Sequence, residues 1–160
     1  MMLLRLALTL MLACSVLFPN LARAEEKPTP QSIQDLVQKA AQLVRDAPED
    51  VARKAFSSDP VFRYGEVYIN VIDENGIWHI YPPNHRNEGK SVYNVRDADG
   101  KLLVQDIIAM ANSAARQGWV KYRWLNPASN QVEPKETFVL AVPEKHLIVY
   151  CGLYRPNESK

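Results

Sequence analysis

The chain has 160 residues, of which 47% are hydrophobic and 23% are charged, and its formal net charge is +1. This length suits one domain, and the composition is typical of a globular chain rather than of a disordered or collagen-like one. The near-neutral charge argues against a nucleic-acid binder that depends on a large basic surface.

The first predicted element is a secretory signal peptide at residues 1–24. Arg5 precedes an apolar run, and an Ala-Arg-Ala triplet ends at Ala24 before two glutamates, which is the usual order of a cleavable signal. The apolar run is shorter than the roughly 20 residues of a transmembrane helix. We expect cleavage after Ala24 and a mature domain at residues 25–160, periplasmic or secreted. An uncleaved membrane tether and a lipoprotein modified at Cys14 are the alternatives.

Cleavage would leave a single cysteine in the domain. Cys14 would be lost with the signal, and the loss of Arg5 and Arg23 would change the net charge to −1. One cysteine cannot form an internal disulfide, so the hydrophobic core must hold the exported domain together. Cys151 lies in the apolar run 147–154, which favours a buried structural thiol over a nucleophile.

A long N-terminal helix is predicted at about residues 30–57. Thr29 and Pro30 suit its N-cap and first position, and Pro48 permits either a kink or a new start. The apolar positions with helical three- and four-residue spacing are Ile33, Leu36, Val37, Ala40, Val44 and Ala47. We expect this amphipathic helix to pack across one face of a sheet.

The sheet is expected at about residues 62–154. Residues 66–73 and 77–81 are rich in β-branched and aromatic residues, and Asn-Gly before Ile77 favours a tight hairpin turn between them. Adjacent strands that are joined by short turns should pair antiparallel.

A second amphipathic helix is predicted from Leu103, with Gly118 as its C-terminal cap. Three more strands follow at 119–125, 136–142 and 147–154. The fold class is therefore α+β: a long N-terminal helix on an antiparallel sheet of five to six strands, with one further helix.

Known catalytic and metal-binding motifs are missing from the sequence. His79, His85 and His146 have no paired spacing, and there is no Cys-x-x-Cys, glycine-rich phosphate loop or Gly-x-Ser-x-Gly turn. We therefore expect that the protein is not an enzyme and that it binds neither a metal ion nor a cofactor.

The chemistry that the sequence does offer is a set of aromatic residues beside a few cations. Strand alternation predicts that residues 119–124 have two faces. One face carries Trp119, Lys121 and Arg123, and the other carries Val120, Tyr122 and Trp124. Tyrosine and tryptophan can wall an apolar pocket, and a lysine at its end could neutralise a carboxylate. The competing interpretation is that the aromatic residues fill the core and the cations are solvated.

Six segments of the sequence occur in an order typical of one known family. They are residues 63–76, 81–90, 97–100 and 118–127, Lys135 with Phe138, and residues 151–154. Together they resemble a single Cache domain of the second single-Cache type, over about residues 31–154. The resemblance implies a PAS-like extracellular sensor fold with a ligand cavity in its sheet.

The resemblance also implies a ligand, a short organic acid such as acetate, propionate or pyruvate. It assigns Lys135 as the carboxylate partner. The ligand-binding residues that it implies are Tyr68, Trp78, His79, Tyr81, Trp119, Tyr122, Trp124 and Lys135. Two positions depart from the family pattern, Tyr81 where histidine is common and Phe138 where tyrosine is common, and both bear on the identity of the ligand.

The resemblance implies a role in signal transduction as well. Cache domains usually sit between two membrane helices of a receptor, kinase or cyclase, whereas only six residues follow Tyr154. We expect a stand-alone exported sensor with no output domain of its own, which presents a small organic acid to a membrane receptor or kinase and binds no nucleic acid. The alternative is a structural or protein-interaction module of the same fold without a small ligand, which acts with a membrane receptor or as a homodimer through its N-terminal helix.

Overall fold

The computed structural model describes residues 27–155. The predicted signal peptide, its cleavage site and the alternative lipid site at Cys14 lie outside these residues. The elements, in chain order, are α1 (Pro30–Asp46), α2 (Glu49–Ser58), β1 (Arg63–Tyr64), β2 (Val67–Tyr68), β3 (Asn70–Asp73), β4 (Trp78–Ile80), the 3-10 helix η1 (His85–Asn87), α3 (Leu103–Ala111), β5 (Gln117–Asn126), β6 (Gln131–Val142), the 3-10 helix η2 (Pro143–Lys145) and β7 (Leu147–Tyr154).

The N-terminal part consists of two helices instead of one helix over residues 30–57. The Thr29 side chain accepts a hydrogen bond from the Ser32 backbone N–H at 3.1 Å, and Pro30 follows it, so the predicted start of α1 is confirmed. Pro48 separates α1 from α2, because it has no N–H to donate and its ψ of 151° is extended. The sequence allowed either a kink or a new helix start at Pro48, and in the structure a new helix, α2, begins there.

The main sheet has the order β4-β3-β7-β6-β5, and all of its neighbours are antiparallel. The predicted β3–β4 hairpin is confirmed, with Gly76 in the turn at a φ of +74°. The predicted strand 66–73 is divided: β2 pairs with β1 in a separate two-stranded sheet, and β3 pairs with β7 in the main one. The last strand, β7, therefore joins the hairpin to the β5–β6 pair.

Helix α3 is shorter than predicted, and Gly118 is not its cap. The helix ends at Ala111, with Asn112 as its C-cap, and Gly118 lies inside β5 with an extended φ of 158°. A β-carbon at Gly118 would lie 2.5 Å from the Sδ of Met110. The glycine therefore allows α3 to pack close to β5.

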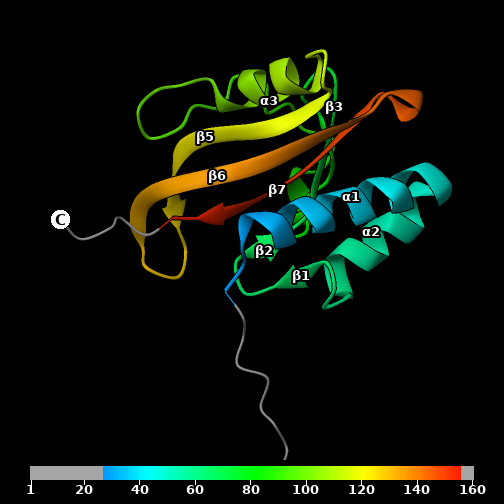
Figure 1. Cartoon of the computed structure of the whole chain (residues 1–160), viewed down its shortest axis with the longest axis horizontal. Helices are drawn as coiled ribbons and strands as arrows, with labels where there is room; N and C mark the ends of the chain where they lie inside the picture. Colours follow the sequence, from blue (N-terminus) through cyan, green and yellow to red (C-terminus); the bar gives the residue numbers. More distant parts are fainter. Residues whose placement is uncertain (1–26, 156–160) are drawn as a thin grey trace, which may run out of the picture.

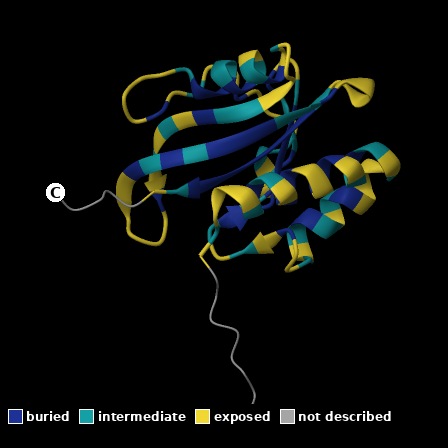
Figure 2. Cartoon of the chain, viewed as in Figure 1, coloured by how far each residue is buried: buried dark blue, intermediate teal, exposed yellow. Residues whose placement is uncertain are grey.

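The helices cover opposite faces of the sheet, with α1 and α2 on one side and α3 on the other (Figure 1). The predicted packing of the N-terminal helix on the sheet is confirmed, because α1 contacts β6 and β7. Buried residues run along the central strands between the two helical layers (Figure 2). One core includes Phe56 and Phe138 on the α1 side, and the other includes Ile107 and Tyr150 on the α3 side.

Candidate functional site

A cavity opens on the α3 side of the sheet, toward the β2 strand and the loop after β4. Its volume is about 70 Å³. For comparison, a cavity that holds one water molecule needs about 10–15 Å³. The lining residues are Glu66, Tyr68, Asn70, Trp78, Tyr81, Val92, Val95, Leu103, Val104, Tyr122, Trp124, Lys135, Thr137, Tyr150 and Gly152. The space suits a molecule of a few non-hydrogen atoms.

Strand alternation brings the polar part of this wall together. Tyr122 of β5 is paired with Lys135 of β6, and Lys135 is paired in turn with Tyr154 of β7. Residues two positions apart on a strand share a face, so Trp124 joins Tyr122 and Thr137 joins Lys135 in the cavity.

Lys135 is a buried cation at the cavity wall, with 5% of its surface exposed. Burial lowers the pKa of its amine from 10.5 to about 8. The Nζ lies 4.3 Å from the centre of the Tyr154 ring and 5.4 Å from that of Tyr68. Within residues 27–155, no carboxylate oxygen lies within 4.0 Å of it. The amine is thus positioned to take an anionic partner from the cavity.

The cavity also contains hydroxyl groups that can donate hydrogen bonds. The Tyr122 hydroxyl lies 2.8 Å from the Thr137 hydroxyl, and the Trp78 Nε1–H donates to the Tyr150 hydroxyl at 3.4 Å. Burial raises the pKa of Tyr122 to about 12, and it raises the pKa values of Tyr68 and Tyr150 as well. The phenols therefore stay protonated at neutral pH, so the cavity has no anionic phenolate to repel an acid.

Aromatic rings from β4 and the following loop form the rest of the wall. The Trp78 and Tyr81 rings are stacked, with centroids 4.1 Å apart and an angle of 14° between their planes. The Tyr68 ring meets Tyr81 edge to face at 6.1 Å. These faces give the cavity an apolar side opposite its hydrogen-bonding groups.

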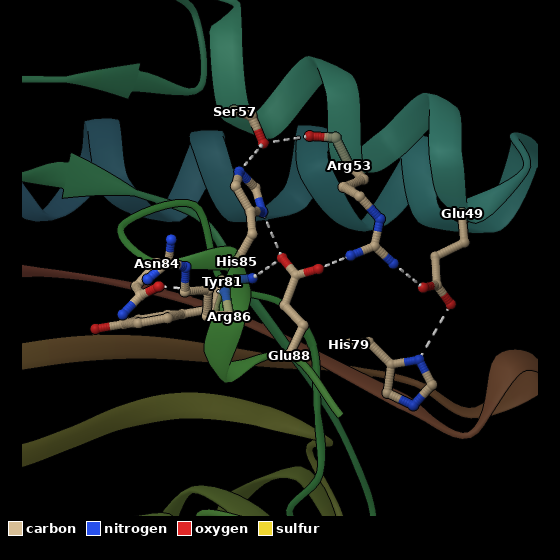
Figure 3. Close-up of polar contacts among 9 residues, drawn as sticks. All are labelled: Glu49, Arg53, Ser57, His79, Tyr81, Asn84, His85, Arg86 and Glu88. Atoms are coloured by element: carbon tan, nitrogen blue, oxygen red, sulfur yellow. Dashed lines mark hydrogen bonds and ion pairs between the residues drawn. The ribbon is translucent and has the colours of Figure 1, made fainter. Parts of the chain in front are cut away.

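Six of the eight predicted site residues line this cavity: Tyr68, Trp78, Tyr81, Tyr122, Trp124 and Lys135. The other two lie elsewhere. His79 extends toward α2, where its Nδ1 lies 3.1 Å from Glu49 Oε2 (Figure 3). Trp119 packs edge to face on Phe138 in the core on the α1 side, with centroids 5.2 Å apart. Whether the six residues bind a ligand remains a prediction.

The sequence prediction missed several lining residues, and alternation could have found some of them. Thr137 is two positions from Lys135 on β6, and Asn70 is two positions from Tyr68. Tyr150 and Gly152 alternate in the same way on β7 and face the cavity together. Glu66 is two positions before Tyr68 in the predicted strand 66–73, so the same alternation would have found it.

Within residues 27–155, no group of three or more histidine, cysteine, aspartate or glutamate side chains is arranged to hold a metal ion. In this part of the chain, none of the helices has the length and apolar character needed to cross a membrane.

The antiparallel sheet, the helices on its two faces and the small aromatic cavity define the class of fold, an α+β domain of the PAS-like kind. The sequence matches the family Single Cache domain 2 over residues 29–156, and the chain belongs to this family. Cache domains are extracellular or periplasmic sensor domains that typically bind ligands without catalysis.

Relatives and solved structures agree with this assignment. The chain is 28% identical over 124 residues to the sensor histidine kinase MctS of Rhizobium johnstonii, and the match covers 77% of this chain and 26% of the kinase. The chain thus spans about a quarter of the length of that curated relative.

Two solved structures cover 78% of this chain. The periplasmic sensor domain of a chemotaxis protein is 29% identical with a TM-score of 0.58, and 88% of that chain is covered. A Cache chemosensory domain studied for carboxylic acid recognition is 22% identical with a TM-score of 0.66, and 91% of it is covered. This chain is therefore similar to sensor domains of chemoreceptors and histidine kinases.

Proposed function

We propose that this domain binds a short monocarboxylic acid, such as acetate, propionate or pyruvate, in the cavity around Lys135. The observation that carries the proposal is a buried amine beside a small aromatic cavity, with no carboxylate oxygen of residues 27–155 within 4.0 Å of it. A charge-assisted hydrogen bond from the protonated amine would fix the carboxylate. The stacked Trp78 and Tyr81 rings would cover the hydrocarbon end.

The comparisons support the proposal at the level of the fold. A Cache chemosensory domain of the same fold was solved for its recognition of carboxylic acids. The cavity volume of about 70 Å³ suits acids of two to four carbons better than larger metabolites.

We also propose that the domain works outside the cytoplasmic membrane and reports its ligand to a membrane receptor or kinase. The proposed signal peptide at residues 1–24 supports export, and the likeness to a sensor histidine kinase supports the kind of partner. Mass spectrometry of the protein recovered from the periplasm tests the export. A mature N-terminus at Glu25 is expected, and a lipid-modified Cys14 would contradict it.

Thermal unfolding in the presence of acetate, propionate, pyruvate and lactate tests the ligand class. An acid at 100 times its Kd should stabilise the protein by about 2.7 kcal/mol. Lys135→Met should remove this effect, because the variant keeps an unbranched side chain of similar length and loses the charged amine. Lys121→Met is the matched control, because Lys121 is 74% exposed and pairs with Glu136 at 3.0 Å.

Two results would contradict the proposal. An equal stabilisation of the Lys135→Met variant would remove Lys135 from the site. No stabilisation by any short acid, together with dimers in sedimentation, would favour the interaction module instead.

A further inference from the structure

A polar stripe on α2 faces β4 and the loop that follows it, on the side of the sheet opposite the cavity. Glu49, Arg53 and Ser57 are four residues apart and so lie on one face of the helix. Figure 3 shows all three pointing toward β4 and the loop that follows it. The helix is fixed on another side by Phe56, which is fully buried and meets Phe62 edge to face at 5.0 Å.

Each residue of the stripe contacts a residue close to the aromatic wall. The Glu49 carboxylate meets His79, the neighbour of Trp78 in β4. The Ser57 hydroxyl lies 3.4 Å from His85 Nε2 in η1. The Arg53 guanidinium pairs with Glu88 and also with Glu49, so it connects the loop to the rest of the stripe.

Glu88 is the centre of these contacts. Its side chain is 13% exposed. Its Oε1 accepts a hydrogen bond from the Tyr81 backbone N–H at 2.9 Å and lies 2.8 Å from His85 Nδ1. Its Oε2 pairs with Arg53. The carboxylate therefore connects α2 directly to the backbone of the residue whose ring is stacked on Trp78.

We infer that Arg53 and Glu88 position Tyr81 for ligand binding, and that α2 is the element that responds when the cavity is filled. The inference rests on the proposed function of the cavity. Glu88 holds the Tyr81 backbone, and Arg53 holds the Glu88 carboxylate in place. Neither side chain lines the cavity, so both act through Tyr81.

The coupling must work in both directions. If the contact between α2 and the loop favours the binding geometry of Tyr81, then a ligand that needs this geometry must stabilise the contact to the same extent. Ligand binding should therefore slow the opening of α2, although no residue of α2 lines the cavity.

Amide hydrogen exchange, followed by NMR on the whole protein, tests the positioning without any ligand. In Arg53→Met the Tyr81 amide should exchange at least about fivefold faster than in the wild type, within the usual range of coupling between sites. Arg45→Met is the matched control, because Arg45 is as exposed as Arg53 (32% against 33%) and pairs with Glu144. Equal Tyr81 exchange in Arg53→Met and the wild type would overturn the inference.

The second measurement uses propionate as the probe. It should slow the exchange of the α2 amides at least about fivefold in the wild type and have a smaller effect in Arg53→Met. Propionate should also bind at least about fivefold more weakly to Glu88→Gln, and the Arg53→Met/Glu88→Gln double variant should be no weaker than the single ones.

The outcomes separate this inference from the proposed function. If propionate raises the Tm and α2 exchange does not change, the coupling is wrong and the binding stands. If propionate has no effect on the Tm, the acid proposal fails for propionate, and the ligand-free exchange of Tyr81 still decides the positioning role.

Discussion

Gly152 of β7 lies directly opposite Thr137 of β6, and the hydroxyl of Thr137 fills the space that a β-carbon at position 152 would need. Such a β-carbon would also lie 3.0 Å from the Cε of Lys135 and 3.0 Å from the carbonyl oxygen of Glu136. The glycine thus leaves room for the lysine stem to reach the cavity across the surface of β7.

Gly152→Ala should therefore destabilise the protein by about 1–3 kcal/mol, the usual cost of overpacking in a core. The urea midpoint measures this loss. Thr137→Ala removes the side chain that collides, so adding it to Gly152→Ala should recover part of the loss. An unchanged midpoint for Gly152→Ala alone would show that Thr137 moves aside without cost.

The sequence predicted those features of the fold that depend on local pattern. The cap at Thr29 and the alternating faces of β5 are confirmed because each is set by neighbours in the chain. The position of β7 between β3 and β6 could not be predicted, because it depends on pairing between segments 74 to 80 residues apart, such as Asn70 with Tyr150. The sequence could not decide between a kink and a new helix at Pro48, because a proline is compatible with both.

The candidate site was harder to predict than the fold, since aromatic character does not say which face a residue occupies. His79 alternates with Trp78 in β4, and Trp119 is an odd number of positions from Tyr122 and Trp124 in β5. Both therefore lie on the far side of the sheet from the cavity. Strict alternation would have separated Trp119 but not His79, because His79 is two positions from Tyr81, which lines the cavity.

The charge of Lys135 should make stability depend on pH. A lysine pKa that burial lowers from 10.5 to about 8 means that the protonated amine costs the folded state about 3 kcal/mol at neutral pH. This cost is complete below pH 8. It falls as the pH rises from about 8 to 10.5, because the folded state then releases its proton before the unfolded state does.

Lys135→Met removes this titration, so it should be the more stable protein at pH 7, and its advantage should shrink from pH 8 toward 10.5. Chemical denaturation of both proteins at each pH measures the difference. The buried tyrosines, whose pKa values are also shifted, cancel because both proteins contain them. A difference that does not depend on pH would show that burial leaves the lysine pKa unchanged.

The thiol of Cys151 should be protected by the fold. Its side chain is fully buried, and burial raises its pKa to about 11, so the reactive thiolate is scarce at neutral pH. Iodoacetamide should label Cys151 at least about a hundredfold more slowly in the native protein than in urea, as expected for a group that reacts after unfolding. Peptide mass spectrometry locates the label, and rapid native labelling at Cys151 would contradict its burial.

Glu66 should set the charge of the acids that the cavity accepts. It lines the same cavity as Lys135, and within residues 27–155 no cation lies within 4.0 Å of its carboxylate. A monocarboxylate that pairs with Lys135 avoids this second charge, whereas a dicarboxylate brings another anion close to it. Glu66→Gln should therefore improve succinate binding relative to propionate by about fivefold or more, about 1 kcal/mol of relieved repulsion. Calorimetric titration measures the ratio, with Glu144→Gln as the control because Glu144 pairs with Arg45 on α1. The same ratio in wild type and Glu66→Gln would show that the carboxylate is too far from the bound acid to select it.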